Sequence, residues 1–361
     1  MLIMQDSSPI DIVYLWVNGD DPIWRRKRKF CWEALGQASR DTSGRHGNVE
    51  GRFRDNDELR YSLRALDHYF PEHGHVYLVT DSQRPSWLAS SDRLTVVDHV
   101  DLIPANGLPT FDSANIESYV HRIPQLSERY FYLNDDVFFG APVRVEDWFW
   151  QGGIYAAWSG DGQVDAGPLV RDADPMDNAC RLSQRWLDKQ ASADLAANTT
   201  DLARWPRLSA YEHTPCTFAH APRPMLRSLL FKLEELAPEL FSQVRSTVFR
   251  SWDKPTIVSD FVIRWALAHG VAKMRDYTQL HISTGDADLP YQLDLLTSLA
   301  GSVDFFCIND TTDNAPIHDP RLAQARLALQ DFLPQPSRFE LTRPALPMPH
   351  ENQMRRYGSL A

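Results

Sequence analysis

Tyr130–Gly140 reads Tyr-Phe-Tyr-Leu-Asn-Asp-Asp-Val-Phe-Phe-Gly, and this stretch decides the expected fold. An aromatic and apolar run, long enough for a buried strand, stops at Asn134, Asp135 and Asp136 and then resumes. Two adjacent carboxylates in such a place cost desolvation free energy unless a cation compensates them. Ligands usually bind at the carboxyl ends of strands in an α/β sheet, so the stretch predicts a divalent metal that holds a phosphorylated substrate. Taken alone, it is equally compatible with a turn whose two Asp side chains face water.

Strand and helix patterns alternate on both sides of this stretch. Strands are expected at Ile10–Val17, His75–Thr80 and Leu94–Val97. Two helices are expected between the strands, and their N-caps are Asp55 or Asn56 for the first and Asp112 or Ser113 for the second. The alternation predicts an α/β fold with a Rossmann-like, mostly parallel sheet flanked by helices.

The C-terminal portion has a helical pattern instead. Helices are expected at Arg181–Lys189, Pro224–Leu236, Ser259–Gly270 and Arg321–Phe332. We therefore expect a single domain over residues 1–330, with an α/β core over about 8–170 and a helical portion over about 175–332. Residues 333–361 contain several prolines and are expected to form an extended, mobile tail.

The composition excludes some classes of function. Of the 361 residues, 43% are hydrophobic, which is enough for one large core or two smaller ones. A formal net charge of −11 argues against non-specific nucleic-acid binding. The four cysteines are widely spaced without a CxxC pair, and a reduced interior is expected. The chain begins without a signal-peptide pattern and has no run long enough to span a membrane, so we expect a cytoplasmic protein.

Two other segments carry polar residues at the ends of expected elements. Asn18 and Gly19 follow the first strand, where a glycine would let backbone amides approach a phosphate and Asn18 could hydrogen-bond a base or ribose. An ordinary Asn-Gly turn is the alternative. Arg52–Arg60 places cations and carboxylates around a helix N-terminus, which is a ready anion site. A solvated, salt-bridged helix start explains that segment nearly as well.

Further polar residues occur on the helix before the Asp135–Asp136 strand. Glu117 and His121 are i, i+4 neighbours there, with Asn115 and Arg122 close by. Polar groups on the outer face of a helix are usually just solvated. This face is expected to lie beside the metal site, so these residues are candidates for substrate binding.

Two residues of the C-terminal portion are candidates for catalysis. His220 lies in an apolar loop bounded by prolines, and a neutral imidazole is a good general base near pH 7. Arg250 follows another apolar pair, and a guanidinium suits an anionic transition state. A zinc site made of His213, Cys216 and His220 is the weaker alternative, because a fourth ligand is missing.

Together these segments resemble the signature blocks of the Stealth family of sugar-1-phosphate transferases. That family includes bacterial capsule and exopolysaccharide phosphotransferases and the catalytic subunit of the animal enzyme that marks lysosomal hydrolases with GlcNAc-1-phosphate. The resemblance covers most of residues 10–310, and the blocks are Ile10–Gly19, Arg52–Arg64 with Val79–Gln83 and Pro85–Leu88, Leu108–Gly140, and Phe305–Asp310. Thr311 stands where the family often has another acidic residue, which weakens the fourth block as a metal site.

The resemblance implies a single catalytic Stealth-type domain and a specific reaction. A nucleotide-sugar, typically UDP-linked, would donate sugar-1-phosphate to a glycan hydroxyl and release UMP, in capsule or exopolysaccharide synthesis. It also implies that His220 and Arg250 match the functional His and Arg of the family. We expect Asp135 and Asp136 to bind Mg²⁺ or Mn²⁺, with Asp136 counted among the catalytic residues.

The expected partners are the nucleotide-sugar donor and a glycan or polysaccharide acceptor, but no nucleic acid. Peripheral association with a membrane export complex, at the inner face of the membrane, is compatible with this function. The residues expected to bind substrate are Asn18, Gly19, Asn56, Arg60, Ser62, Asn115, Glu117, His121, Arg122 and Asn134.

Two alternative functions remain open on the sequence alone. A metal-dependent glycosyltransferase would use the same acidic pair to transfer the sugar without its phosphate and would release UDP. An inactive carbohydrate-binding protein would need neither the acidic pair nor His220 and Arg250, so their presence argues against it.

Overall fold

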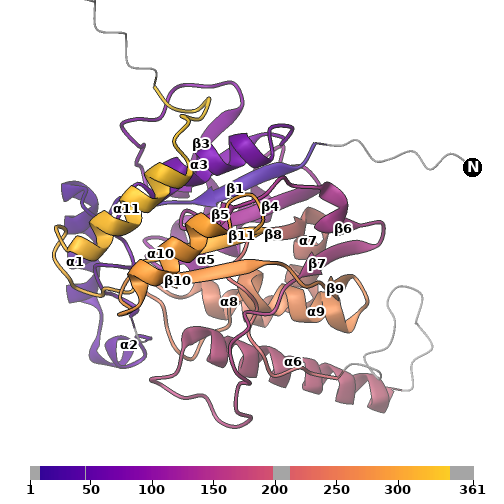
Figure 1. The fold of residues 1–361 in the computed structure, drawn as a ribbon. Coiled ribbons are helices and arrows are strands. Elements are labelled where there is room, and N and C mark those ends of the chain that lie inside the picture. Colours follow the sequence, from indigo (N-terminus) through magenta and orange to yellow (C-terminus); the bar gives the residue numbers. More distant parts are fainter. Residues whose placement is uncertain (1–8, 45, 198–211, 342–361) are drawn as a thin grey trace, which may run out of the picture.

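The computed structural model describes residues 9–44, 46–197 and 212–341, and its centre is a five-stranded sheet in the order β3-β2-β1-β4-β8 (Figure 1). The strands are β1 (Asp11–Leu15), β2 (Val76–Thr80), β3 (Leu94–Asp98), β4 (Arg129–Asn134) and β8 (Arg223–Leu226). The first four run parallel to their neighbours and β8 runs antiparallel to β4. The expected α/β class with a mostly parallel sheet is confirmed.

The strand register places the carboxyl ends of neighbouring strands side by side, at the edge of the sheet where a ligand is expected to bind. Leu15, the last residue of β1, pairs with Val79 of β2 and with Asn134 of β4. β1 and β2 are buried along their whole length, since apolar side chains cover both faces of the sheet. β4 buries its four central residues and reaches the edge at Asn134. The carboxyl ends of three neighbouring strands therefore meet where the Asp135–Asp136 turn begins.

The first expected helix, α3 (Glu58–Tyr69), is present but begins later than expected. Its N-cap is Asp57, in the left-handed region with a φ of 69°, rather than Asp55 or Asn56. Asn56 does not cap the helix, because its side-chain amide and its backbone N–H both donate to the Glu58 carboxyl group (2.8 and 2.6 Å). The apolar stripe of α3 packs into the core as its spacing predicts.

The second expected helix is short. Asp112 caps α5 (Ser113–Glu117) by accepting the Ala114 N–H, and a 3-10 turn, η2 (Val120–Arg122), follows. The Ser118 hydroxyl donates to a carbonyl of α5, which competes with the next helical turn. The remaining helical segments before residue 170 are α1 (Pro22–Ala34), α2 (Gln37–Asp41), α4 (His99–Leu102), η1 (Ala105–Gly107) and η3 (Val145–Asp147).

The C-terminal portion contains the expected helices together with strands that the helical pattern did not predict. Its helices are α6 (Pro175–Ala197), α7 (Arg227–Leu236), α8 (Pro238–Arg245), the π-helix η5 (Ile257–Phe261), α9 (Val262–Ala268), α10 (Leu289–Ser298) and α11 (Pro320–Phe332). None of the helices in the described segments combines the length and the apolar character of a membrane span.

Two smaller sheets accompany the central one. The first has the order β10-β11-β5 and is made of β10 (Gln279–Ser283), β11 (Phe305–Asn309) and β5 (Val137–Phe139). The second has the order β6-β7-β9 and is made of β6 (Phe149–Trp150), β7 (Gly153–Ala156) and β9 (Ala272–Met274). Because β5 directly follows the acidic turn, the first small sheet ties the C-terminal strands to the site.

The segment after α11 returns to the N-terminal core. The Phe339 carbonyl accepts the Ala89 N–H (2.8 Å), and the Leu341 N–H donates to the Trp87 carbonyl (2.8 Å). Phe339 is fully buried, and α11 lies against α3 (Figure 1). The first residues of the expected mobile tail are thus packed against the domain, and residues 342–361 lie outside the described residues.

Candidate functional site

A cavity of about 370 Å³ opens at the carboxyl ends of β1, β2 and β4. Its position agrees with the rule that ligands bind at this edge of an α/β sheet. The polar and charged residues that line it are His46, Arg52, Arg54, Glu58, His99, Thr110, Ser113, Asn134, Asp135, Asp136, Asp174, His220, Arg250, Asn309, Asp310, Thr311 and Asp313.

The acidic pair, Asp135 and Asp136, forms the turn between β4 and β5. Burial raises the pKa of Asp135 well above its usual range, and the nearby carboxyl groups of Asp136, Glu58 and Asp55 raise it further. Burial also raises the pKa of Asp136 to about 6. Within the described residues, no Lys or Arg side chain forms an ion pair with either carboxylate. The Cys307 thiol donates to Asp136 Oδ2 at 3.5 Å, and His220 Nε2 lies 3.6 Å from Asp136 Oδ1. The ionised form of the pair is therefore disfavoured by burial, and no Lys or Arg of the described residues compensates it.

Two more carboxyl groups lie close enough to the pair to raise the pKa of Asp135. Burial raises the pKa of Asp55 to about 6 and, together with Asp55, raises the pKa of Glu58 to about 8. Two buried oxygen atoms near them, Asp136 Oδ1 and Asn134 Oδ1, have no hydrogen-bond partner among the described residues. Buried polar atoms are rarely left unpaired, so these atoms point to a ligand that supplies positive charge.

His220 lies beside the acidic pair, in the loop before β8. Its Nε2 accepts from the Asn134 side-chain amide at 3.0 Å, and its Nδ1 lies 3.6 Å from Cys307 Sγ. Burial lowers the pKa of His220 well below its usual value, and the cations Arg223 and Arg250 lower it further. The imidazole is thus neutral near pH 7, and the amide contact leaves Nε2 as the unprotonated nitrogen.

Two guanidinium groups form a cationic side of the cavity. Arg250 and Arg52 both donate to the hydroxyl of Ser113, at 3.0 and 3.1 Å. Both also lie 3.9 Å from Asp112, which is one carboxylate for two cations. Burial, together with the neighbouring charge of Arg250, lowers the pKa of Arg52 to about 9. Such a pair with excess positive charge is suited to a phosphate group.

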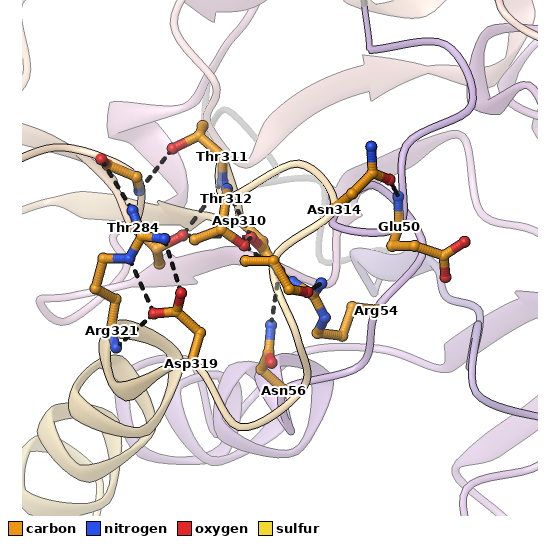
Figure 2. A network of polar contacts seen from close by, with 12 residues as sticks. Glu50, Arg54, Asn56, Thr284, Asp310, Thr311, Thr312, Asn314, Asp319 and Arg321 are labelled. Carbon is orange, nitrogen blue, oxygen red and sulfur yellow. Dashed lines mark hydrogen bonds and ion pairs between the residues drawn. The ribbon is translucent and has the colours of Figure 1, made fainter.

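Asp310, in the fourth sequence block, is the centre of a different carboxylate site (Figure 2). Its Oδ2 accepts from the Arg54 guanidinium, and its Oδ1 accepts from the Thr312 hydroxyl (2.6 Å) and N–H (3.0 Å). Asn56 and Thr284 complete the network with longer contacts of 3.4 Å. Both oxygen atoms of Asp310 are therefore occupied by protein donors, and we call this group the Asp310 network.

The predicted site residues divide into those that line the cavity and those that do not. The cavity brings together Asn134, Asp135, Asp136, His220 and Arg250. These five residues come from three separate parts of the chain: the β4–β5 turn, the loop before β8 and the segment after α8.

Asn18 and Gly19 do not line the cavity, although Trp16 and Val17 beside them do. The Asn18 N–H donates to Gln83 (2.9 Å), and its side-chain oxygen accepts the Asp20 N–H (2.9 Å). A Cβ on Gly19 would lie 2.3 Å from a carbonyl oxygen of Phe53, so the glycine is required by close backbone packing.

Arg60, Ser62 and Asn56 are held by protein contacts. Arg60 and Arg64 share the buried Glu340 carboxylate, at 2.6 Å each. The Ser62 hydroxyl contacts the Tyr14 hydroxyl (2.9 Å) and donates to a backbone carbonyl at the start of β5. Asn56 belongs to the α3 start described above. The role of these three residues in substrate binding stays a prediction.

The four polar residues on α5 and η2 join these segments to the C-terminal helices. The Asn115 amide donates to a backbone carbonyl after α8 (2.8 Å), and Glu117 accepts from the Ser259 hydroxyl in η5 (3.1 Å). His121 and Arg122 both contact Glu234 of α7, at 2.9 and 2.7 Å. None of the four is among the residues that line the described cavity, and their expected role in substrate binding also stays a prediction.

The alternative zinc trio is not assembled. His213 Nε2 lies 3.5 Å from Cys180, whereas His220 is grouped with His281 and Cys307. The sequence pattern failed here because ligands that are neighbours in sequence point to different parts of the fold.

Other residues of the cavity were not predicted as site residues. Arg52 and Glu58 lie inside a sequence block that was noted, but nothing in their spacing indicated that they face the cavity. Ser113 was predicted only as a cap. Its contact with Arg250 spans 137 residues of sequence, and no local pattern reports a contact of that kind.

Comparison with known proteins confirms the resemblance stated from the sequence. Residues 8–31 match the family model described as Stealth protein CR1, conserved region 1, and residues 52–157 match Stealth protein CR2, conserved region 2. An exopolysaccharide phosphotransferase of Streptomyces coelicolor is 35% identical over 340 residues, which are 92% of this chain and 52% of that protein. The exopolysaccharide phosphotransferase CpsY of Mycobacterium tuberculosis is 29% identical over 335 residues, which are 92% of this chain and 58% of that protein. The chain thus spans about half the length of these curated relatives.

Among solved structures, the galactosyltransferase LgtC in complex with donor and acceptor sugar analogs matches with a TM-score of 0.43 and 9% identity. That match covers 93% of this chain and 98% of the LgtC chain.

Proposed function

We propose that this chain, which carries conserved regions 1 and 2 of the Stealth proteins, transfers a sugar-1-phosphate from a nucleotide-sugar to a hydroxyl of a glycan acceptor in exopolysaccharide synthesis. One observation carries the proposal. A single cavity combines an acidic pair that has no ion pair with a Lys or Arg of the described residues, a neutral imidazole beside it, and two guanidinium groups that share one carboxylate. That combination suits a diphosphate bound together with a cation.

Asp135 and Asp136 are the residues that would hold Mg²⁺ or Mn²⁺. Their burial, their raised pKa values and the unpartnered Asp136 Oδ1 fit a hard cation with oxygen ligands. When bound, such a cation neutralises negative charge on the diphosphate and on the departing UMP.

His220 would serve as the general base. The Asn134 amide holds Nε2 in its unprotonated form, and an acceptor hydroxyl would replace that amide as the hydrogen-bond donor. As the acceptor oxygen forms its bond to the sugar-bearing phosphorus, its proton passes to Nε2. The bond from this phosphorus to the bridging oxygen breaks, and the electron pair leaves with UMP.

Arg250 and Arg52 would bind the phosphate oxygens. Ser113 and Asp112 hold the two guanidinium groups side by side, so their donors are arranged before substrate arrives. Fixed donors of this kind stabilise the charge of a phosphoryl-transfer transition state without further reorganisation.

The test is to incubate purified chain and Mg²⁺ or Mn²⁺ with a panel of nucleotide-sugars and a glycan acceptor, and to separate the nucleotide products by chromatography. The proposal predicts UMP from a UDP-sugar. UDP would instead identify a glycosyltransferase that transfers the sugar alone. No nucleotide product from any donor, with glycan binding retained, would identify an inactive carbohydrate-binding protein. The Asp136→Asn variant is the matched control for contaminating activity.

We further propose a cytoplasmic location with peripheral association at the inner face of the membrane, near an export complex. The outer face of α1 supports it, because Arg26 and Lys29 are exposed there beside Phe30, which is 72% exposed. Cell fractionation tests this location, which predicts a protein released from the membrane fraction by salt. Recovery in the culture medium would overturn it.

A further inference from the structure

A second group of metal-binding side chains lies on the Nδ1 side of His220. His220, His281 and Cys307 each offer one ligand atom, and these atoms all lie within 4.8 Å of one another. The parallel register of β10 and β11 pairs His281 with Cys307. Paired residues on neighbouring strands project to the same face, so two of the three side chains are held on rigid elements.

The spacing and the chemistry of this group fit a soft cation. Cys307 Sγ lies 3.6 Å from His220 Nδ1 and 3.5 Å from Asp136 Oδ2. A tetrahedral zinc ion with bonds of about 2.0–2.3 Å separates its ligands by about 3.3–3.7 Å. Thiolate and imidazole ligands favour Zn²⁺, whereas the oxygen atoms of Asp135 and Asp136 favour Mg²⁺ or Mn²⁺. The two groups of ligands therefore select different metals.

We propose that His220, His281 and Cys307 bind a soft divalent cation such as Zn²⁺, and that this binding switches off sugar-1-phosphate transfer. The inhibitory part rests on the proposed function, because it acts on the base assigned there. Cys307 binds as the thiolate and releases its proton to solvent. The exposed side chain of His281 gives the ion a route from solvent to the buried thiol.

The inhibition follows from the tautomer of His220. Without the soft metal, the Asn134 contact keeps Nε2 unprotonated, so this nitrogen can accept the acceptor proton. A metal bound through Nδ1 leaves the single proton of the neutral imidazole on Nε2. Nε2 then donates instead of accepting, and the acceptor hydroxyl has no base.

Metal binding is tested by titrating the purified chain with Co²⁺ alone and recording thiolate-to-cobalt charge-transfer absorption in the near ultraviolet. We expect the band in the native protein, its loss in Cys307→Ala, and at least about tenfold weaker binding in His281→Ala. Cys180→Ala is the matched control, since the Cys180 thiol also contacts an imidazole, that of His213. A band that survives Cys307→Ala, or that disappears in Cys180→Ala, would overturn the site.

The inhibitory half is tested by titrating UMP release with Zn²⁺ at saturating Mg²⁺. His281 lies outside the cavity, so His281→Ala should keep the basal rate within about twofold. It should need about tenfold more Zn²⁺ for half-inhibition. Equal inhibition of both proteins would overturn the switch. The cobalt titration is read without turnover, so absent UMP release would contradict the proposed function, whereas an absent cobalt band would contradict the metal site.

Discussion

Two groups of carboxylates line the same cavity, but the protein neutralises only one of them with a cationic side chain in the described residues. In the Asp310 network, both oxygens of the carboxylate accept hydrogen bonds from Arg54 and Thr312 (Figure 2). In the acidic pair, Asp136 has a thiol and an imidazole as side-chain neighbours, and neither Asp135 nor Asp136 has an ion pair with Lys or Arg in the described segments. Both groups lie at strand ends and both are shielded from solvent, so the difference lies in the donors that surround them.

This difference separates a structural carboxylate from a ligand-binding one. An ionised carboxylate without partners costs several kcal/mol in a protein interior. Arg54 removes that cost for Asp310 within the fold itself. For the acidic pair, the free-energy cost of burying ionised carboxylates is offset only when a cation binds. The raised pKa values of Asp135 and Asp136 reflect this cost. A carboxylate that the protein leaves uncompensated at a cavity is therefore the better candidate for metal binding.

The largest expected effect is on turnover by Asp136→Asn. The substitution keeps the shape of the side chain and removes its charge, so nucleotide release should fall by about 10³-fold or more. The melting temperature should stay equal or rise, because a buried charge beside Asp135 is removed. Activity assays and thermal melts check both parts. Retained activity would remove the acidic pair from the mechanism.

Asp310→Asn should lower the stability of the protein, in contrast to Asp136→Asn. It breaks a buried ion pair with Arg54, whose side chain is 5% exposed, at a cost of about 3–5 kcal/mol. The melting temperature should fall by roughly 5–10 °C. A protein that melts like the native chain would show that the Asp310 network does not stabilise the fold. That result would contradict the distinction between a structural carboxylate and a ligand-binding one.

We expect the free energy of unfolding to depend on pH, with the buried Glu58 carboxyl group as a main contributor. Its pKa is raised from 4.5 to about 8 by burial and by Asp55. Between pH 4.5 and 8 the unfolded chain loses this proton while the folded chain keeps it, so stability falls as the pH rises through that window. We expect the melting temperature to drop by about 2–5 °C more between pH 5 and 7 in the native protein than in Glu58→Gln. Parallel melting curves for the two proteins would contradict the assignment.

The smallest expected effect concerns the cationic side. Arg250→Lys keeps a positive charge but loses the planar fork that donates to Ser113. Turnover should fall by about tenfold with an unchanged melting temperature. Arg64→Lys is a suitable control, because Arg64 is paired with Glu340 away from the cavity and its substitution should affect stability rather than rate. A lower melting temperature for Arg250→Lys would identify a structural arginine.

The sequence predicted those parts of the molecule that are encoded locally. Apolar runs indicated the parallel strands, and the interruption at Asn134–Asp136 indicated the acidic pair, since both signals lie within a few residues. The shared hydroxyl of Ser113 and the neutralisation of Arg60 by Glu340 were not predicted. Those contacts join segments that are 137 and 280 residues apart, and hydrophobic periodicity carries no information about them.

The most direct test of the account is to count bound Mn²⁺ by electron paramagnetic resonance, with Mn²⁺ alone added to the purified chain. The free-ion signal should show one bound ion per native chain, and none after Asp135→Asn and Asp136→Asn are combined. Asp310→Asn should still bind one ion, since its carboxylate is already occupied by Arg54 and Thr312. Binding that survives the double substitution, or that is lost in Asp310→Asn, would contradict the account.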